Sequence, residues 1–570
     1  MQTSIYKPLH GISINDFSIE PLISQIIDIT NQANDIPSHD NIGQQAVYLT
    51  FRKHGKRVAS AKTFCENWQS GLTALLQPFI ERIADNNWYK NVVTSIEVNL
   101  LYSPKQLPSS SLIKSLPKNN SRGRKAIIFS SSAKDYWFPP LEMIARNLSF
   151  TRALEITLEK EGLSLNEINN KQENLPDSFY AMCFDTAQIL LLTTPTPSIV
   201  PLFRGNQIVS SKNISLENVT SSAKEMSTWM QQNVHNDGRL TYKYWPSSGK
   251  ESDAQSMIRQ FMGTLCLIRA AKFYNDLELQ ASAIKNLDYN ISNFYQSDNS
   301  FSYIIENNEK VKLGACAIAG MCFLEAPNSI KYQPHLEAIT NLTKHLQQSD
   351  GSFLTFYKPD GRNDCQNFYP GEALCFWVNL WIKTQDQDLL ERIYGAFYYY
   401  RNWHREQPNP AFIPWHTQAY FALWKETKDD ELLKFIFEMN DWLLPVQQWK
   451  SAPTADTKGR FYDPKRPFGP PHASATGVYI EGLVDAWSLA NNIGDSERSH
   501  AYRTAICRAL RSIIQLQCIN EADMYYISKK KKAFGGVRTT VYDNEIRVDN
   551  VQHNLMGIFK AIESGIEISL

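Results

Sequence analysis

Long apolar segments and an excess of charge are both absent from this sequence. Nowhere do about 18 uninterrupted apolar residues occur, the length that a membrane-spanning helix needs, so we expect no membrane span. Lys+Arg and Asp+Glu both number 58, so the net charge is zero and nothing favours nucleic acid or an acidic membrane as a partner. Residues 1–18 lack an apolar stretch behind basic residues, so we predict no signal peptide and a cytoplasmic protein.

Cysteine pairs at metal-binding spacing are also lacking. The nine cysteines include no C-x-x-C pair, and several lie within apolar helical patterns: Cys266, Cys316, Cys322, Cys375 and Cys507. An odd number of cysteines in such surroundings indicates reduced core residues rather than a disulfide framework. We therefore predict no structural zinc, no other metal and no cofactor.

The chain is too long for one ordinary core, so two or more domains are expected. Up to about residue 205, short β-rich runs alternate with helical patterns, which indicates an α+β domain. The predicted strands are residues 46–51, 58–61, 95–102 and 125–130. The predicted helices are residues 64–83 and 141–162.

Three segments of this region carry a recognisable order of motifs. They are YLTFRKHGKR (48–57), IEVNLLYSP (96–104) and AIIFSSSAKDYWFPPLEM (126–143), followed by a helix that closes on EKEGLS (159–164). Over residues 40–205 this order resembles the AMMECR1 domain family. The Arg-Gly-Cys-Ile-Gly signature of that family is here Arg57-Val58-Ala59-Ser60-Ala61. The resemblance therefore implies a structural role, or the docking of a protein partner, rather than an activity tied to that signature.

From about Ser221 onward strands disappear from the pattern and a weak repeat begins. A helix ends in an aromatic or Gln-rich segment, and a polar turn and a short aromatic piece follow. The turns are marked by Gly238, Ser300, Gly351, Ala411, Gly459 and Ala522, at spacings of 48 to 63 residues. Such a spacing holds a helical hairpin, and six hairpins bury their apolar faces by closing into a ring.

We therefore predict an α+β N-terminal domain (1–205), a linker (206–220) and a mainly α (α/α)6 toroid (221–570). Small and aromatic residues predict inner helices at 313–324, 371–381, 415–424 and 474–487. In a closed ring the starts of the inner helices gather at one rim, where the core has no need of polar residues. Functional residues are expected at that rim.

Two predicted inner helices begin with residues suited to chemistry. Glu372 falls in a first turn beside Tyr369, where the helix dipole favours a negative charge, and a simple cap is the alternative interpretation. Trp415 and His416 open the next inner helix. His416 is expected to face the rim, with a surface histidine as the alternative.

A third group of candidates belongs to the helix at 474–487. His472 precedes this helix, and Glu481 lies within it in an otherwise apolar stretch. Burial there would raise the pKa of a carboxyl group, as a general acid requires, and a structural hydrogen bond is the alternative.

The segment 542–553 concentrates acids, bases and amides ahead of the last apolar helix. With Asn550 as the cap, Asp549 lies just before the helix and His553 one turn in, so the carboxylate could orient the imidazole. Arg547 and Gln552 can donate hydrogen bonds to hydroxyls or a carboxylate.

Two further residues complete the candidate set. Tyr542 opens the segment just described. Arg259 stands near a helix start, where it could clamp an anionic group or pair with an acid of a neighbouring helix.

The predicted ring resembles the six-hairpin glycosidase superfamily, which includes N-acylglucosamine 2-epimerase-like proteins. The resemblance is carried by the ring itself, by the aromatic residues and carboxylates expected at its rim, and by the FYPGEAL segment. The resemblance covers residues 220–570 and implies a carbohydrate-active enzyme whose aromatic side chains stack on sugars. A hydrolase would use a carboxylate pair from Glu372, Glu481 and Asp549. An epimerase would use His416 and His553 as paired acid and base.

Other classes of function stay open. A polysaccharide lyase would use Tyr542 or Tyr369 as its base, and a non-catalytic scaffold would need only a binding patch. A terpene cyclase is disfavoured because no Asp-x-Asp-Asp motif occurs, and a lanthionine cyclase because the cysteines lie in apolar runs. The expected partner is a carbohydrate or another small molecule.

Overall fold

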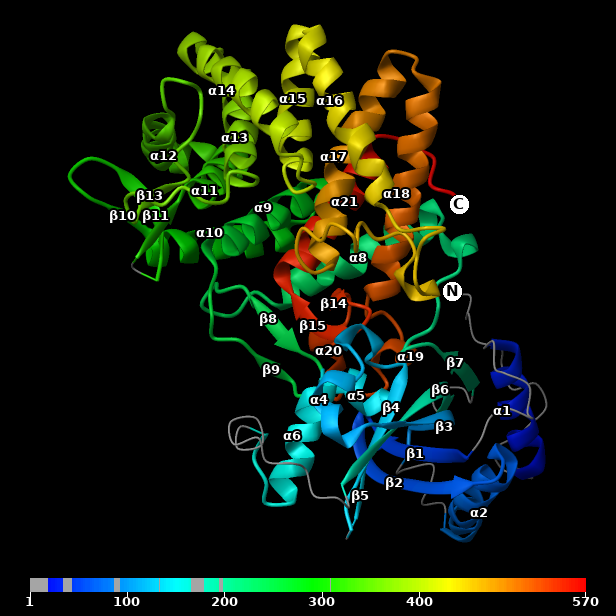
Figure 1. Ribbon diagram of the computed structural model, residues 1–570. Coiled ribbons are helices and arrows are strands. Elements are labelled where there is room, and N and C mark those ends of the chain that lie inside the picture. Colours follow the sequence, from blue (N-terminus) through cyan, green and yellow to red (C-terminus); the bar gives the residue numbers. More distant parts are fainter. Residues whose placement is uncertain are drawn as a thin grey trace.

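The N-terminal part of the chain folds around one antiparallel sheet. The computed structural model describes residues 19–33, 44–86, 93–132, 134–165, 179–193, 198–307 and 309–570. Seven strands run in the order β2-β1-β3-β6-β4-β5, with β7 paired to β6 (Figure 1). They are β1 (Gln45–Lys53), β2 (Lys56–Cys65), β3 (Ser95–Leu107), β4 (Lys125–Ser130), β5 (Asp135–Phe138), β6 (Tyr180–Leu192) and β7 (Ser198–Leu202).

Side-chain alternation divides this sheet into two buried faces. On β1, Val47 and Leu49 point to a core shared with helices α1 (Ile19–Ala33) and α2 (Trp68–Asn86), whereas Tyr48 points to the opposite face. Successive residues of a strand point to opposite sides, so a strand with both faces covered reads as a continuous apolar run. This explains the unbroken AVYLTF pattern in the sequence.

The helix predicted over residues 141–162 is wrong as a single element. It is two helices, α5 (Pro140–Ala145) and α6 (Phe150–Lys160). Asn147 adopts a left-handed backbone conformation with φ of 52°, which a continuing helix cannot contain. Ser149 then caps α6 by accepting a hydrogen bond from the Arg152 backbone N–H at 3.0 Å.

The C-terminal part is a closed ring of helical hairpins. In the described residues the inner helices are α9 (Met257–Tyr274), α11 (Leu313–Glu325), α13 (Tyr369–Thr384), α15 (Ile413–Thr427), α17 (Ala473–Asn492) and α21 (Val548–Glu563). Each contacts the next, and α21 contacts α9 again, so the ring is complete. Amphipathic hairpins bury their apolar faces only when the ring closes in this way.

Six outer helices pack against the inner ones. They are α8 (Leu216–Gln232), α10 (Leu277–Phe294), α12 (Gln333–Leu346), α14 (Gln387–Glu406), α16 (Asp430–Leu443) and α18 (Ser496–Leu516). The outer partner of α21 is α8, so the first and last long helices of this part close the ring together. Since α8 begins at Leu216, it starts inside the segment predicted as a linker.

The prediction that strands disappear after Ser221 is wrong in the connecting segments. One small sheet has the order β14-β15-β8-β9, with β8 (Lys243–Trp245), β9 (Lys250–Glu251), β14 (Arg538–Thr540) and β15 (Asp543–Arg547). A second contains β10 (Tyr295–Ser297), β11 (Ser302–Glu306), β12 (Lys310–Lys312) and β13 (Phe356–Lys358). Only the pairings of β15 with β8 and of β12 with β13 join segments far apart in the sequence. The other pairs are local, but their strands have two to five residues, which is too short for a clear alternating pattern. β15 runs directly into α21 and thereby places the start of that helix.

Several short helices complete the chain. They are α4 (Leu112–Ser115), α19 (Glu521–Met524) and α20 (Lys530–Ala533), and the 3-10 turns Ser109–Ser111, Asn119–Ser121, Ser211–Asn213, Ser329–Tyr332, Leu444–Val446 and Ala455–Thr457. No helix within the described ranges combines the length and apolar character needed to cross a membrane. In the same ranges the cysteines form no disulfide and no cluster of metal-ligating side chains occurs.

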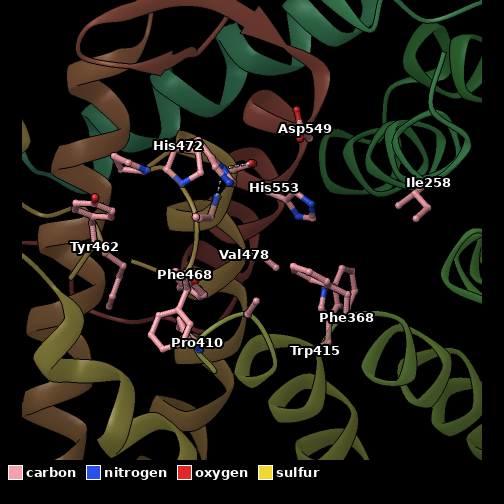
Figure 2. A pocket seen from close by; sticks show the side chains of 18 of the residues that line it. Ile258, Phe368, Pro410, Trp415, Tyr462, Phe468, His472, Val478, Asp549 and His553 are labelled. Atoms are coloured by element: carbon pink, nitrogen blue, oxygen red, sulfur yellow. Dashed lines mark hydrogen bonds between the residues drawn. The ribbon is translucent and has the colours of Figure 1, made fainter. Parts of the chain in front are cut away.

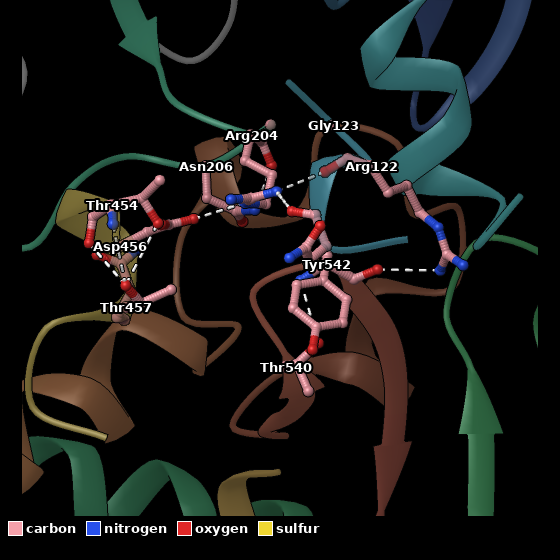
Figure 3. Close-up of polar contacts among 12 residues, drawn as sticks. Arg122, Gly123, Arg204, Asn206, Thr454, Asp456, Thr457, Thr540 and Tyr542 are labelled. Atoms are coloured by element: carbon pink, nitrogen blue, oxygen red, sulfur yellow. Dashed lines mark hydrogen bonds and ion pairs between the residues drawn. The ribbon is translucent and has the colours of Figure 1, made fainter. Parts of the chain in front are cut away.

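A buried ion pair joins the sheet to the ring. Arg204 Nε lies 2.7 Å from Asp456 Oδ2, with both side chains 2% exposed, and Arg204 also donates to the backbone oxygens of Asn120 and Arg122 (Figure 3). Arg122 in turn donates to the backbone oxygen of Tyr542 at 2.9 Å. The two parts therefore share a buried polar interface, in which Arg204 pairs with Asp456 whereas the Nε atom of Arg122 has no hydrogen-bond partner among the described residues.

Close contact between α17 and α21 gives the first prediction. A methyl group at Gly477 would lie 2.6 Å from the Asn554 backbone nitrogen, whereas one at Gly395 on α14 would meet no atom within 4 Å. Gly477→Ala is expected to destabilise the protein by about 1–3 kcal/mol through overpacking. Gly395→Ala, the matched control, is expected to stabilise it by up to about 1 kcal/mol. Thermal unfolding of both variants checks this, and equal shifts in Tm would contradict the close approach.

Candidate active site

A cavity of about 340 Å³ lies where five of the inner helices begin. Figure 2 shows side chains from different helices around one open space. Nine of the residues expected at the rim line it: Arg259, Tyr369, Glu372, Trp415, His472, Arg547, Asp549, Gln552 and His553. They come from the first two turns of α9, α13, α15 and α21, and from the residues just before α17 and α21. The ring thus brings together groups that are up to 294 residues apart in the chain, from Arg259 to His553.

Another wall of the cavity comes from the segment between α16 and α17, which the sequence analysis did not single out. Phe461, Tyr462, Asp463 and Phe468 line the cavity, together with Pro471. Figure 2 shows Tyr462 and Phe468 well apart from Ile258 and Phe368 across the space. The dense aromatic and proline content of KRPFGPPH, directly before an inner helix, was the signal that could have identified this wall.

The central polar contact of the cavity joins His553 to Glu481. His553 Nδ1 lies 2.9 Å from Glu481 Oε1, and Glu481 is fully buried behind the imidazole. An ionised carboxylate can only accept, so Nδ1–H donates to it and Nε2 keeps its lone pair. No described residue bonds to Nε2, which leaves this nitrogen as a candidate general base at the cavity.

The sequence-based partner of His553 was therefore wrong. Asp549 does not orient the imidazole, because it is held by two guanidinium groups: Arg259 Nε lies 2.9 Å from Oδ2, and Arg547 Nε lies 2.9 Å from Oδ1. The cap assignment was wrong as well. α21 has its N-cap at Arg547, and Asn550 lies inside the first turn, donating to Thr539 Oγ1 at 2.9 Å.

The two carboxyl groups at the cavity, those of Glu372 and Asp549, have different pKa values because their surroundings differ. Burial alone would raise the pKa of Asp549, but Arg259 and Arg547 more than offset it and hold that pKa well below its usual range. Burial raises the pKa of Glu372 to about 8, with Arg259 and Lys312 opposing the change. At neutral pH, Asp549 is therefore a carboxylate and Glu372 carries a proton that it can donate.

A glycine on the neighbouring helix α11, Gly314, leaves room for the side chain of Glu372. A methyl group at Gly314 on α11 would lie 2.0 Å from Glu372 Oε2, so only glycine fits there. Oε2 has no hydrogen-bond partner among the described residues, although it is buried. A buried, unpartnered carboxyl oxygen costs stability, which is typical of a group kept for a ligand.

His472 is the second imidazole at the cavity. Its Nδ1 accepts hydrogen bonds from Ser474 Oγ at 2.7 Å and from the Ala475 backbone N–H at 3.3 Å, as the cap of α17. Burial lowers the pKa of His472 to about 4, an effect that Asp549 opposes. His472 is therefore neutral at pH 7 and its Nε2–H can donate to a ligand hydroxyl.

Aromatic and amide groups supply the remaining surface. Trp415 packs edge-on against His553, with ring centroids 6.1 Å apart. Tyr369 lies nearby on α13, and burial raises its pKa far above the usual value, which opposes a role as a base. The Gln552 Oε1 atom is buried without a hydrogen-bond partner in the described chain, so it can accept from a ligand.

Three predicted site residues do not line the cavity: His416, Tyr542 and Glu481. His416 is 1% exposed, stacks on Phe412 with ring centroids 3.6 Å apart and bonds through Nδ1 to the Tyr420 hydroxyl at 2.9 Å. Burial holds its pKa well below the usual value. Consecutive helical residues point about 100° apart, and the rotation of α15 that turns Trp415 to the cavity turns His416 toward Phe412 and Tyr420.

Tyr542 belongs to the interface with the N-terminal sheet instead. Its ring lies 6.0 Å from the Arg204 guanidinium carbon, in the turn between β14 and β15 (Figure 3). The extended strand β15 separates it from the start of α21, which carries the cavity residues. Glu481 is also absent from the cavity wall, since His553 covers it.

No protein-family model and no curated protein matches this sequence. Among solved structures, the chain is similar to D-mannose isomerase, with 11% identity, a TM-score of 0.46, and coverage of 61% of this chain and 97% of that one. It is similar to cellobiose 2-epimerase from Bacillus thermoamylovorans B4167, with 10% identity, a TM-score of 0.46, and coverage of 60% and 98%. The alpha-1,6-mannanase GH76A of Salegentibacter sp. HEL1_6 has 12% identity, a TM-score of 0.44, and coverage of 61% and 99%. These identities and TM-scores are too low to transfer any chemistry from those proteins, so the chemistry of the cavity is inferred from the residues of this chain alone.

The raised pKa of Glu372 gives the second prediction. In the folded protein the carboxyl group of Glu372 keeps its proton up to about pH 8, whereas in the unfolded chain it loses the proton near pH 4.5. Between these two pH values ionisation stabilises only the unfolded state, so the free energy of unfolding falls as the pH rises. Glu372→Gln cannot ionise and should gain stability relative to wild type between about pH 5 and about pH 8, on the order of a few kcal/mol. Urea unfolding at several pH values measures the difference.

Glu426→Gln serves as the control for this measurement, because Glu426 is exposed on α15. Its stability difference from wild type is expected to stay constant over the same pH range. A constant difference for Glu372→Gln as well would show that its carboxyl group titrates like an exposed one.

Proposed function

We propose that the cavity is the active site of a carbohydrate-converting enzyme that moves a proton at a sugar carbon, as an epimerase or an aldose–ketose isomerase does. The hydrogen bond between Glu481 and His553 supports this proposal most directly. A buried carboxylate fixes the tautomer of a histidine that faces a cavity, which is the arrangement a general base requires.

The proposed reaction begins on the open-chain sugar. His553 Nε2 removes the proton from the carbon next to the carbonyl group, and Glu481 stabilises the resulting imidazolium. The electron pair of the broken C–H bond forms a C=C bond, and the electron pair of the C=O π bond moves onto the carbonyl oxygen, to which Glu372 donates its proton, giving a neutral enediol. In an isomerisation, a proton returns to the former carbonyl carbon, and the hydroxyl group on the neighbouring carbon gives its proton to the Glu372 carboxylate and becomes the new carbonyl group. In an epimerisation, the proton returns to the opposite face of the first carbon, and the hydroxyl group made from the carbonyl oxygen gives its proton back to Glu372. Neither reaction needs an oxidant.

The other cavity groups suit the binding of such a substrate. Arg259 and Arg547, fixed by Asp549, place positive charge near the developing oxyanion. Trp415 and Tyr369 offer aromatic faces of the kind that pack on sugar rings. An epimerase that pairs His416 with His553 is not part of this proposal, because His416 lies outside the cavity.

Glycoside hydrolysis is a second candidate, favoured by the two carboxyl groups of opposite character. Glu372 as a protonated acid and Asp549 as a carboxylate form the pair that a glycosidase needs. Against it, both carboxylate oxygens of Asp549 are engaged by arginines, which weakens it as a nucleophile or base. Proton transfer by His553 therefore has the stronger support.

Deuterium incorporation tests the proposal. Purified protein is incubated in D₂O with free aldoses, ketoses and reducing disaccharides, and exchange of the carbon-bound proton is followed by NMR. His553→Ala is expected to lower the exchange rate by about 10²–10⁴-fold, the usual contribution of a general base. Glu481→Gln should retain folding and lose about 10–100-fold, as variants of a positioning partner do.

The controls separate the competing functions. His500→Ala removes an exposed imidazole on α18 and should exchange like wild type. Hydrolysis of a glycoside panel that depends on Glu372 and Asp549 but not on His553 would establish the hydrolase instead. Absence of exchange and hydrolysis over the whole panel would favour a non-catalytic role.

A further inference from the structure

One end of the proposed active site carries more positive than negative charge. Arg259 on α9 and Arg547, the N-cap of α21, both bind the carboxylate of Asp549. Arg259 Nε lies 2.9 Å from Oδ2, Arg547 Nε lies 2.9 Å from Oδ1, and Arg547 Nη2 also donates to Oδ2. Because two guanidinium groups share one carboxylate, one positive charge of this arginine cluster remains without a counterion.

The shared carboxylate leaves part of each guanidinium group available to a ligand. Arg259 Nη2 and Arg547 Nη1 have no hydrogen-bond partner among the described residues, and both arginines line the cavity. Asp549 occupies the other side of each group, and Ser256 Oγ accepts from Arg259 Nη1 at 3.2 Å. A guanidinium group is always charged and has five N–H donors. The remaining donors are therefore charged, unused and held in place by the protein.

A further hydrogen-bond donor lies in the field of the two arginines. His472 accepts from the Ala475 backbone N–H through Nδ1, so its ring proton is on Nε2. Burial is the main cause of the lowered pKa of His472; Asp549 opposes it, and Arg547 and Arg259 add to it. A neutral imidazole N–H thus accompanies the guanidinium groups at this end of the cavity.

The other acidic groups at the cavity do not offset this charge. Glu372 keeps its proton at neutral pH, because burial raises its pKa to about 8. Asp463 belongs to the segment between α16 and α17 and pairs with Arg466 at 3.7 Å. Glu481 lies behind the ring of His553 and outside the lining. The arginine cluster therefore favours a negatively charged group of a ligand.

We propose that the substrate is an anionic sugar, whose carboxylate or phosphate group is bound by the arginine cluster beside His472. This inference rests on the proposed function in taking the ligand to be a sugar, and it adds the charge that the sugar carries. Contacts between a guanidinium group and an oxyanion are charge-assisted and can be bidentate, so they favour a carboxylate or a phosphate over a hydroxyl group.

The two arginines can serve the anionic group and the reacting carbonyl group at the same time. Arg259 opposes the effect of burial on the pKa of Glu372, so it lies on the side of the general acid. Arg547 comes from the end of β15 and binds Asp549 through both Nε and Nη2. We therefore assign the anionic group to Arg547 and His472, and the developing oxyanion to Arg259.

A purely structural role of the arginines is the alternative. They would then only neutralise Asp549 at the start of α21, as buried ion pairs often do. That role predicts no preference of the cavity for charged sugars over neutral ones. Binding measurements with matched sugars therefore distinguish the two roles.

The test compares glucose, glucuronate and glucose 6-phosphate, which differ only at C6. Calorimetric titration of the full chain measures each dissociation constant and requires no turnover. At least one anionic sugar is expected to bind about tenfold or more tightly than glucose, through its charged contacts. The preference should shrink at about 0.5 M salt, because ions screen the charges. Tighter binding of glucuronate would identify a carboxylate, and tighter binding of glucose 6-phosphate a phosphate.

Variants locate the preference within the cavity. Arg547→Gln should remove most of it and change the affinity for glucose by less than about threefold. Arg547→Lys keeps the charge without the planar donor group, so it should retain part of the preference and guards against an effect of misfolding. The matched control is Lys465→Gln, which removes the same charge from an exposed residue outside the cavity lining and should bind like wild type.

Three outcomes would overturn the inference. They are equal affinity of wild type for glucose and both anionic sugars, absence of binding by all three at about 10 mM, and an equal loss of preference in Lys465→Gln and Arg547→Gln. The proposed function fails on a different result. Sugars that bind with the expected preference but never exchange their carbon-bound proton would refute the proton transfer and leave the anionic-sugar site in place.

Discussion

Closure of the helical ring by α21 is the constraint on which the rest of the structure depends. The last inner helix fits between α9 and α17, and it contacts α17 more extensively than any other pair of helices in the ring. Gly477 allows this approach, because any larger residue would strike the α21 backbone. The same approach sets His553 against Glu481, so the packing that completes the core also forms the central polar contact of the cavity. Stability and chemistry are linked here through one helix–helix interface.

The N-terminal part of the chain contributes to the cavity without lining it. Asn147 donates to Asp543 Oδ1 at 2.9 Å, and Asn544 donates to the backbone oxygen of Ile144 at 2.7 Å. These bonds hold β15, the strand that runs directly into α21 and carries Arg547 to the cavity. The buried Arg204–Asp456 pair strengthens the same interface. The N-terminal part therefore acts as a support that fixes where the last inner helix begins.

Within the cavity, the surroundings rather than the residue types decide the charges. Glu372 and Asp549 are both buried carboxyl groups at helix starts, yet only Asp549 has arginines in direct contact. Burial without a bonded partner keeps Glu372 protonated at neutral pH, and burial with two cations keeps Asp549 ionised. His472 and His553 differ for the same kind of reason, since one caps a helix through Nδ1 and the other donates from Nδ1 to a carboxylate. Such pairs with opposite character are typical of acid–base sites.

The amino-acid sequence by itself determined the helices, since apolar periodicity is local and a hairpin with one apolar face has to bury it in a ring. It also placed Glu372 and Trp415 in first turns, because Pro and aromatic residues mark helix starts. Only the tertiary structure decided that Trp415 rather than His416 faces the cavity, since the rotation of α15 is set by the helices packed around it. The pairing of His553 with Glu481, 72 residues away, rather than with neighbouring Asp549 was decided in the same way. Contacts between distant segments follow from packing, and no local pattern encodes which of two nearby polar residues such packing will turn inward.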